Sequence, residues 1–389
     1  MRVGKIMSGK KMVVYGGIIA ALLVATFSAS VLADDNATAD LQERLNAAEA
    51  KIASLEETRE PTWLESRRTE EVQALVKEVL ADADSRAMLQ GSTSPVTVDV
   101  HGFVQTRYSY NSGGGVEANH GFEIPRARLI LTGKVYDFDY RVSGQWTDGH
   151  SFDLLDAWGS TDVFGLDFKF GQFKSPFMKA WEISAADTLA ADRSLVTYTF
   201  GQGRSQGIQL GKEWGPVHIR GAYTDGFNSA NGDGVPNGYA LSGRVDWDVT
   251  DWWNVGAAIS WNDLDVTDYW TYTFDTGVSF GGFGAEVAYV GRNQDAGNDW
   301  ALQAQASYKF TDSIQPYVQY EYGELPGEEA LSLVTFGVNY YFNDHVKWTT
   351  DFGYALNGVG AGWDTAETGW NASTDSGEYL VRTQITLQF

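Results

Sequence analysis

Two arginines near the start of the region after residue 97 have the spacing of a basic ladder on one face of a strand. Arg126 and Arg128 are two residues apart in the segment 122–132. Because side chains two apart along a strand point to the same side, both guanidinium groups should share one face, together with Ile124. A guanidinium group binds carboxylate or phosphate through paired, charge-assisted hydrogen bonds. We expect both side chains to point into water, so the pair predicts a short basic ladder on that face.

The same two-residue period assigns further charged side chains to the water-facing side. The other arginines that are candidates for anion guidance are Arg107, Arg141, Arg220 and Arg244. Further bases expected on this side are Lys169, Lys309, Lys347 and Arg382. The acids expected there are Asp99, Asp139, Asp246, Asp275, Glu286, Glu321, Asp351 and Glu378. The wall is therefore mixed in sign, and each arginine either guides an anion or is neutralised by a neighbouring carboxylate.

A hydrophobic period of two continues from Thr97 to the last residue and defines the elements that position these charges. In one run, Trp270, Tyr272 and Phe274 alternate with polar residues. An apolar face with aromatics near the strand ends and a hydrophilic opposite face are typical of a transmembrane barrel rather than a sandwich. About sixteen such runs are present, and a barrel of that size encloses an aqueous channel. The sequence predicts an all-β transmembrane barrel of about sixteen antiparallel strands, which matches the strand range of bacterial barrels.

Turn-forming residues predict the connections between these strands. Short turns are expected at 311–313 and 342–345. Longer outer loops, rich in Gly, Asn and Asp, are expected at 111–120, 228–238, 293–298 and 357–376. The last strand, 378–389, alternates regularly and ends on Phe389, a pattern that indicates insertion into an outer membrane.

One long segment, 173–200, interrupts the alternation. It contains Lys174, Lys179 and Arg193, and Arg204 follows it. A segment of this length in a barrel either projects outward as an external loop or folds into the lumen and narrows it. In the second case these four bases form part of the constriction.

The first 96 residues have a different character. Residues 1–33 combine a basic start, an apolar stretch shorter than a membrane span and small residues before Ala33, which predicts a cleaved signal peptide. Residues 34–90 show heptad-like spacing at Leu41, Leu45 and Ile52, which predicts a helical, coiled-coil-like periplasmic segment. It either packs on the rest of the protein or serves to oligomerise or tether the chain. Residues 91–96 are a linker, and 97–389 form the barrel.

Composition excludes several classes of protein. The formal charge of −23 speaks against a nucleic-acid partner, and the absence of cysteine excludes disulfides and cysteine-ligated metals. Only five histidines and no Gly-x-Ser-x-Gly motif are present, so we expect no enzymatic activity. The oxygen-rich stretch 228–237 lacks the closing Glu of a calcium loop and is expected to be a plain loop. We expect no cofactor and no metal.

Short motifs along the barrel are similar to those of a known family. In chain order they are 101–103 (HGF), 122–129 (FEIPRARL), 171–177 (GQFKSPF), 192–194 (DRS), 204–207 (RSQG) and 341–343 (YFN). With them the chain resembles the phosphate-selective porin O and P family of outer membranes. The resemblance implies a trimer of sixteen-stranded pores whose third loop folds inward. It also implies that Arg126, Arg128, Lys174, Arg193 and Arg204 guide phosphate, although the acidic long loop departs from a strongly basic constriction.

Together these features predict an outer-membrane porin, a water-filled channel for small hydrophilic solutes and ions, including anions such as phosphate. Its expected partners are these solutes, outer-membrane lipid and two further copies in a homotrimer. The alternative is a structural envelope protein whose N-terminal helices tether the outer membrane to peptidoglycan, with the pore secondary.

Overall fold

The computed structural model describes residues 96–113, 117–147, 151–231, 238–264, 267–294, 297–373 and 375–389. The chain divides into two compact units, Met1–Arg86 and Ala87–Phe389. The predicted signal peptide (1–33), the helical segment (34–90) and all but the last residue of the linker (91–96) lie outside the described residues. The following description therefore concerns the barrel.

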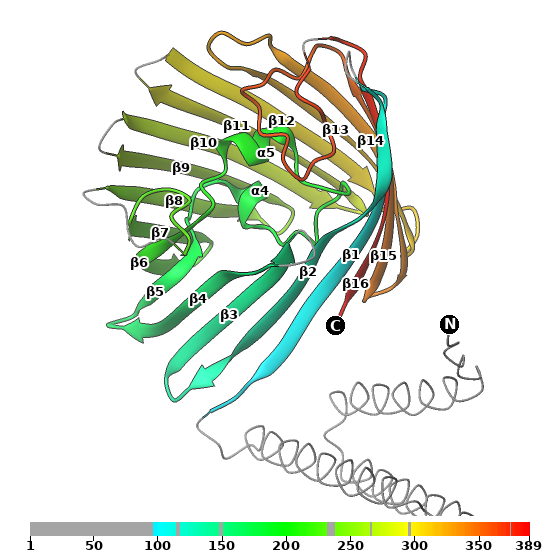
Figure 1. Ribbon diagram of the computed structural model, residues 1–389. Helices are drawn as coiled ribbons and strands as arrows, with labels where there is room; N and C mark the ends of the chain where they lie inside the picture. Colours follow the sequence, from blue (N-terminus) through cyan, green and yellow to red (C-terminus); the bar gives the residue numbers. More distant parts are fainter. Residues whose placement is uncertain are drawn as a thin grey trace, which may run out of the picture. The chain divides into compact units, whose positions relative to one another are not determined.

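Sixteen antiparallel strands close into one barrel (Figure 1). The strands are β1 (Asp99–Asn111), β2 (Asn119–Val135), β3 (Phe138–Thr147), β4 (Ser151–Val163), β5 (Leu166–Lys174), β6 (Arg204–Trp214), β7 (Val217–Thr224), β8 (Tyr239–Thr250), β9 (Trp253–Leu264), β10 (Thr267–Phe280), β11 (Phe283–Gln294), β12 (Gly297–Tyr308), β13 (Ile314–Glu324), β14 (Leu331–Asn343), β15 (Val346–Ala355) and β16 (Tyr379–Gln388). Each pairs with its sequence neighbours, and β1 pairs with β16 from Phe103↔Gln388 to Asn111↔Leu380. The predicted fold class is confirmed.

The outer face of the barrel is apolar and the inner face is polar, as the alternation predicts. On β10, Trp270, Tyr272 and Phe274 are 46%, 43% and 52% exposed, whereas Thr271 and Thr273 between them are each 3% exposed. Such a surface is unfavourable in water but suits a lipid environment, where closure of the barrel also pairs every strand edge. No helix in the described part of the chain is long and apolar enough to cross a membrane.

The connections differ in length at the two ends of the barrel. Those that follow even-numbered strands are short, from two residues (136–137) to five (309–313), and they include the predicted turns near 311–313 and 342–345. Those that follow odd-numbered strands include the long ones, notably 175–203 after β5 and 356–378 after β15. The predicted loop at 293–298 is shorter than expected, because the β11–β12 ladder continues to Gln294↔Gly297.

An irregularity between β1 and β2 changes the predicted face of one residue. Gln105 is opposite Arg126, but Arg107, two residues further, is opposite Glu123. The extra residue on β2 is a β-bulge, which resets the in–out alternation. Ile124 is consequently 63% exposed on the outer surface. The prediction that it shares a face with Arg126 is wrong for this reason.

The long segment after β5 folds into the barrel instead of projecting outward (Figure 1). It carries two short helices, α4 (Lys179–Glu182) and α5 (Leu195–Phe200), and the side chain of Ser194 caps α5 by accepting from the N–H of Thr197. Its apolar residues, among them Phe177, Leu195 and Phe200, belong to one buried cluster with Leu331, Leu333 and Ala355 of the wall. Of the two alternatives for this segment, the inward one is confirmed.

Candidate functional site

Side chains of β13 and β15 hold the inward segment 175–203 in place by hydrogen bonds to its backbone. Buried carboxylates accept from two of its N–H groups, Glu321 from Val196 and Asp351 from Ala191, both at 3.0 Å. The ammonium group of Lys347 donates to the carbonyls of Ala186 and Thr188, each at 2.8 Å. These bonds give the segment a defined position in the lumen, so its charged side chains face defined partners on β1, β2, β7 and β11.

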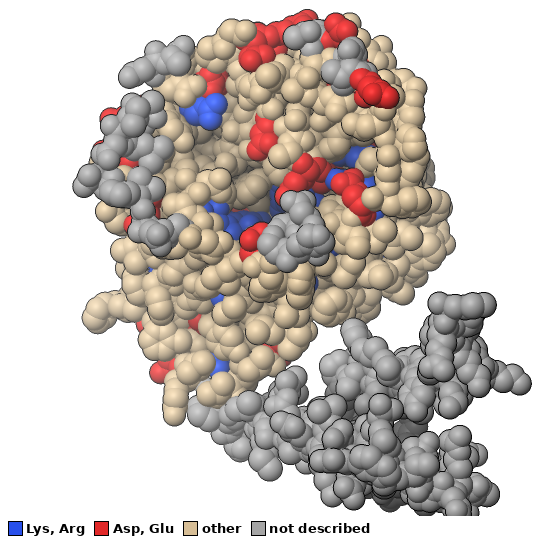
Figure 2. All heavy atoms as spheres, in the orientation of Figure 1, with Lys and Arg blue, Asp and Glu red and all other residues tan. Residues whose placement is uncertain are grey.

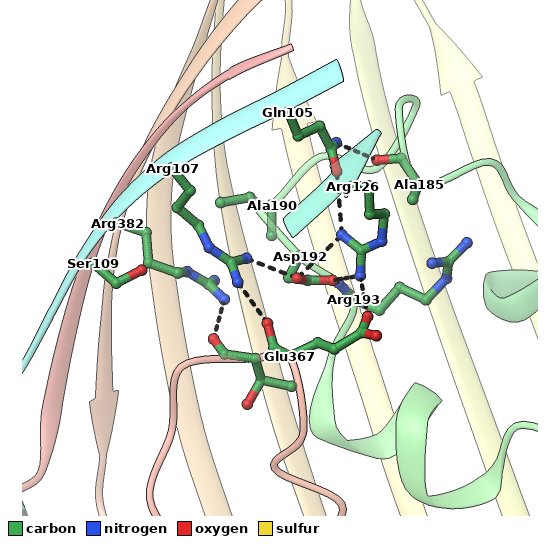
Figure 3. Close-up of polar contacts among 12 residues, drawn as sticks. Gln105, Arg107, Ser109, Arg126, Ala185, Ala190, Asp192, Arg193, Glu367 and Arg382 are labelled. Carbon is green, nitrogen blue, oxygen red and sulfur yellow. Dashed lines mark hydrogen bonds and ion pairs between the residues drawn. The ribbon is translucent and has the colours of Figure 1, made fainter. Parts of the chain in front are cut away.

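Asp192 of the inward segment lies between two wall arginines (Figure 3). Its Oδ2 accepts from Arg107 Nη1 at 2.7 Å, and its Oδ1 accepts from Arg126 Nη2 at 2.9 Å and from the Tyr198 hydroxyl at 2.8 Å. Burial favours the neutral acid, but the charges and hydrogen bonds of Arg126 and Arg107 outweigh it and hold the pKa of Asp192 well below its usual range. Burial and the charge of Asp192 raise the pKa of Tyr198.

A second carboxylate reaches the same arginines from the loop that follows β15. Glu367 Oε2 is 2.9 Å from Arg126 Nη2, and the backbone carbonyl of Glu367 accepts from Arg107 Nη2 at 2.6 Å. We name Arg107, Arg126, Asp192, Tyr198 and Glu367 the Asp192 cluster.

Arg107 and Arg126 do face inward, as predicted. The expectation that the Arg126 side chain points into water is wrong, because the two inward segments cover it and it is only 2% exposed.

Three further cations near this cluster have no carboxylate partner among the described residues. Arg128 donates from Nη2 to the amide oxygen of Gln145 at 2.6 Å and lies over the ring of Phe103. The Lys174 ammonium donates only to backbone carbonyls, including that of Trp181 at 2.7 Å. Arg193 lies over the Trp181 ring and donates to a single backbone carbonyl. We call these three residues the free-cation group.

Two members of the free-cation group, Arg128 and Arg193, have an unused hydrogen-bond donor. Among buried side-chain atoms of the described residues, the Nε atoms of Arg128 and Arg193 lack a hydrogen-bond partner. Burial and the positive charge of Arg126 lower the pKa of Arg193 from its ordinary value. A buried cation without a counter-charge is costly, so an anion at this place would be favoured. In Figure 2, the blue Lys and Arg surface lies deep in the hollow of the viewed face, with red Asp and Glu surface beside it and along the rim.

The remaining candidate bases are neutralised by acids of the wall and the inward segment. Arg141 and Arg204 share Asp156, at 3.4 Å and 2.8 Å. Arg220 pairs with Glu182 and Asp246, Arg244 pairs with Asp246 and Asp275, and Lys179 lies 3.4 Å from Glu286. Each of these five bases therefore lies within ion-pair distance of a carboxylate.

Two of the bases assigned to the constriction loop lie elsewhere. Lys174 is the last residue of β5 and Arg204 the first of β6, and they are opposite each other in register. The alternation breaks down at strand ends, so sequence could not separate them from the loop. Sequence reasoning also missed Asp156, Tyr198 and Glu367 as partners, since no local pattern marks them. Within the described ranges, no group of three or more His, Asp or Glu side chains could hold a metal ion.

No protein-family model and no curated protein sequence matches this chain. Solved barrels resemble it in structure. An anion-selective porin from Comamonas acidovorans superposes with a TM-score of 0.60 at 14% identity, over 76% of this chain and 100% of that one. OmpT of Vibrio cholerae, an outer membrane protein in its trimer form, gives 0.55 at 15% identity, over 76% and 99%. OmpF of Salmonella typhi gives 0.55 at 14% identity, over 75% and 97%. These likenesses establish the porin-type barrel fold. Membership of the phosphate-selective porin O and P family stays a prediction.

Proposed function

We propose that this protein is a channel of the outer membrane that admits small hydrophilic solutes and prefers anions. The observation that carries the proposal is the free-cation group, Arg128, Lys174 and Arg193, inside a closed barrel whose outer face is apolar. A charged lumen governs which ions enter it. Positive groups without counter-charges at the narrowed part of the lumen therefore favour anions over cations.

The lumen as a whole does not carry this preference, because most of its charges are paired. Arg141, Arg204, Arg220 and Arg244 each contact a carboxylate. Paired charges attract ions of neither sign strongly, whereas the free-cation group acts over roughly a Debye length of about 8 Å at physiological salt. We infer that selectivity depends on these three residues rather than on an arginine ladder along the wall. Phosphate is the anion that the family resemblance implies.

The remaining parts of the proposal follow from the sequence. We propose a signal peptide at 1–33, a periplasmic helical segment at 34–90, a linker at 91–96 and the barrel at 97–389. We also propose that three copies associate in the membrane. OmpT of Vibrio cholerae, which was solved in a trimer form, supports this assembly only through its similar fold.

Single-channel recording tests the proposal. The full-length protein in planar bilayers should conduct, and a KCl gradient should give a reversal potential of the sign expected for chloride preference. Arg193→Gln should reduce that preference, whereas Lys212→Gln should not, since Lys212 is exposed and donates to the carbonyl of Gly165 in a short turn. Absence of conductance would refute the channel, and cation preference would refute the role of the free-cation group.

A further inference from the structure

The loop after β15 covers the constriction from inside the barrel. Its Trp363 and Trp370 are 2% and 6% exposed and belong to the same apolar cluster as Leu195 and Phe200 of α5. The Trp363 and Phe200 rings are 6.3 Å apart, and the N–H of Asp364 donates to the hydroxyl of Thr199 at 3.0 Å. Two segments far apart in sequence, 175–203 and 356–373, therefore narrow the same part of the lumen.

Side chains of the barrel wall hold this loop by its backbone. Arg107 donates to the carbonyl of Glu367 at 2.6 Å, Arg382 to that of Thr368 at 2.9 Å and Asn111 to that of Gly369 at 2.7 Å. Glu367 has φ +65, in the left-handed region that a non-glycine residue adopts at an energetic cost. The three carbonyl contacts compensate that cost, and they do so without using the Glu367 side chain.

The Glu367 carboxylate lies at the surface of the inward loop, where one side contacts Arg126 and the other is exposed. Its Oε2 is 2.9 Å from Arg126 Nη2 and 3.3 Å from the hydroxyl of Tyr198. Its side chain is 47% exposed, whereas that of Asp192, on the same guanidinium, is fully buried. Water and salt screen a half-exposed carboxylate more than a buried one, so the pair of Arg126 with Glu367 is weaker than its pair with Asp192. Glu367 thus occupies, in contact with water, the position at which a solute anion would meet Arg126.

We propose that Glu367 is a specificity-determining residue, a built-in counter-ion that competes with entering anions for Arg126 and lowers the anion preference of the channel. The inference rests on the proposed channel function. Arg107 and Arg126 carry two positive charges, and Glu123, Asp192 and Glu367, which pair with them, carry three negative charges. The net charge of these five side chains is 2 − 3 = −1, and it becomes zero when the Glu367 carboxylate is removed.

The size of the effect follows from Coulomb's law. A unit charge about 4 Å from a permeating anion contributes about 1 kcal/mol in water, which corresponds to roughly a fivefold change in local anion concentration. Salt reduces this effect when the charge is further away. Removing the carboxylate should therefore raise the chloride-to-potassium permeability ratio about two- to fivefold.

The test compares Glu367→Gln with wild type in planar bilayers, using the full chain and reversal potentials in a KCl gradient. Glu329→Gln is the matched control, because Glu329 is an exposed acid on the connection between β13 and β14, at the same end of the barrel, and contacts no cation among the described residues. Glu367→Gln should raise the ratio by the stated factor and Glu329→Gln should leave it unchanged. In an Arg126→Gln background the effect of Glu367→Gln should be smaller than in the wild-type background, since residues in contact are not additive.

Glu367→Gly serves as a second variant, because glycine accepts the positive φ at this position and also removes the carboxylate. The same rise is expected from it. An unchanged ratio in both variants, with normal conductance, overturns the inference and leaves the channel proposal standing. An equal rise in Glu329→Gln also overturns it, since the effect would then be one of overall charge. A wild-type protein that does not conduct overturns both proposals.

Discussion

Asp192 offers the sharpest test of how the constriction is held, through the substitution Asp192→Asn. The carboxylate is fully buried and accepts from two guanidinium groups, at 2.7 Å and 2.9 Å. The asparagine amide keeps one oxygen acceptor but loses the charge, and its nitrogen faces a cation. Breaking a buried ion pair by removing one partner costs about 3–5 kcal/mol. With a slope of about 3 kcal/mol per M of urea, the unfolding midpoint should fall by at least about 1 M.

The measurement is urea unfolding of the protein reconstituted in lipid, with Asp312→Asn as the control. Asp312 lies in the exposed turn between β12 and β13 and has no partner among the described residues, so its substitution should leave the midpoint unchanged. Destabilisation of the inward segment should also appear as larger current fluctuations in open channels. A midpoint shift of less than about 0.3 M would refute the reasoning, because the buried pair would then contribute no more than a surface pair does.

The same variant has a defined pH dependence. The folded-state pKa of Asp192 is lowered, so its contribution to stability is fully present above the unfolded-state pKa of about 3.9 and is lost as the pH falls toward the folded-state pKa. The difference in free energy of unfolding between wild type and Asp192→Asn should therefore be constant from pH 7 to about pH 5 and shrink below about pH 4. A difference that instead grows on acidification would contradict the assigned sign.

Three further outcomes are expected. Arg128→Gln should lower the chloride preference, measured by reversal potential, more than Arg126→Gln does. The reason is that Arg128 has no carboxylate partner among the described residues, whereas Arg126 contacts two. Equal effects of the two substitutions would contradict this distinction. Gly171→Ala should destabilise the barrel by about 1–3 kcal/mol in urea unfolding, since Gly171 has φ +116 and a Cβ there would lie 2.2 Å from a backbone carbonyl oxygen. Gly121→Ala is the control, because a Cβ at Gly121 would meet open space. Deleting residues 34–90 should leave conductance and reversal potential unchanged, because the Asp192 cluster and the free-cation group lie within the barrel. Loss of trimers or of outer-membrane attachment would support the alternative that these residues tether the outer membrane. Altered ion selectivity would contradict the prediction.

Local sequence patterns were sufficient for the architecture of the barrel. The two-residue period of a strand is a property of the backbone, so it assigns each side chain to the inner or outer face without knowledge of any partner. The number of strands, the inward direction of Arg107, Arg126 and Arg244, and the terminal strand β16 were all predictable in this way. The prediction failed at Ile124, where a bulge inserts a residue and shifts the period.

The charge state of the constriction was decided by tertiary structure alone. Whether an arginine attracts an anion depends on the carboxylate beside it, and that carboxylate comes from elements far away in the chain: Asp192 is 66 residues from Arg126, and Glu367 is 241 residues from it. Strand periodicity carries no information on such contacts, because they require the segments 175–203 and 356–373 to fold inward onto the wall. Sequence thus determined which residues face the inside of the barrel, whereas packing decided that Arg126 is paired with carboxylates and that Arg128, Lys174 and Arg193 are not.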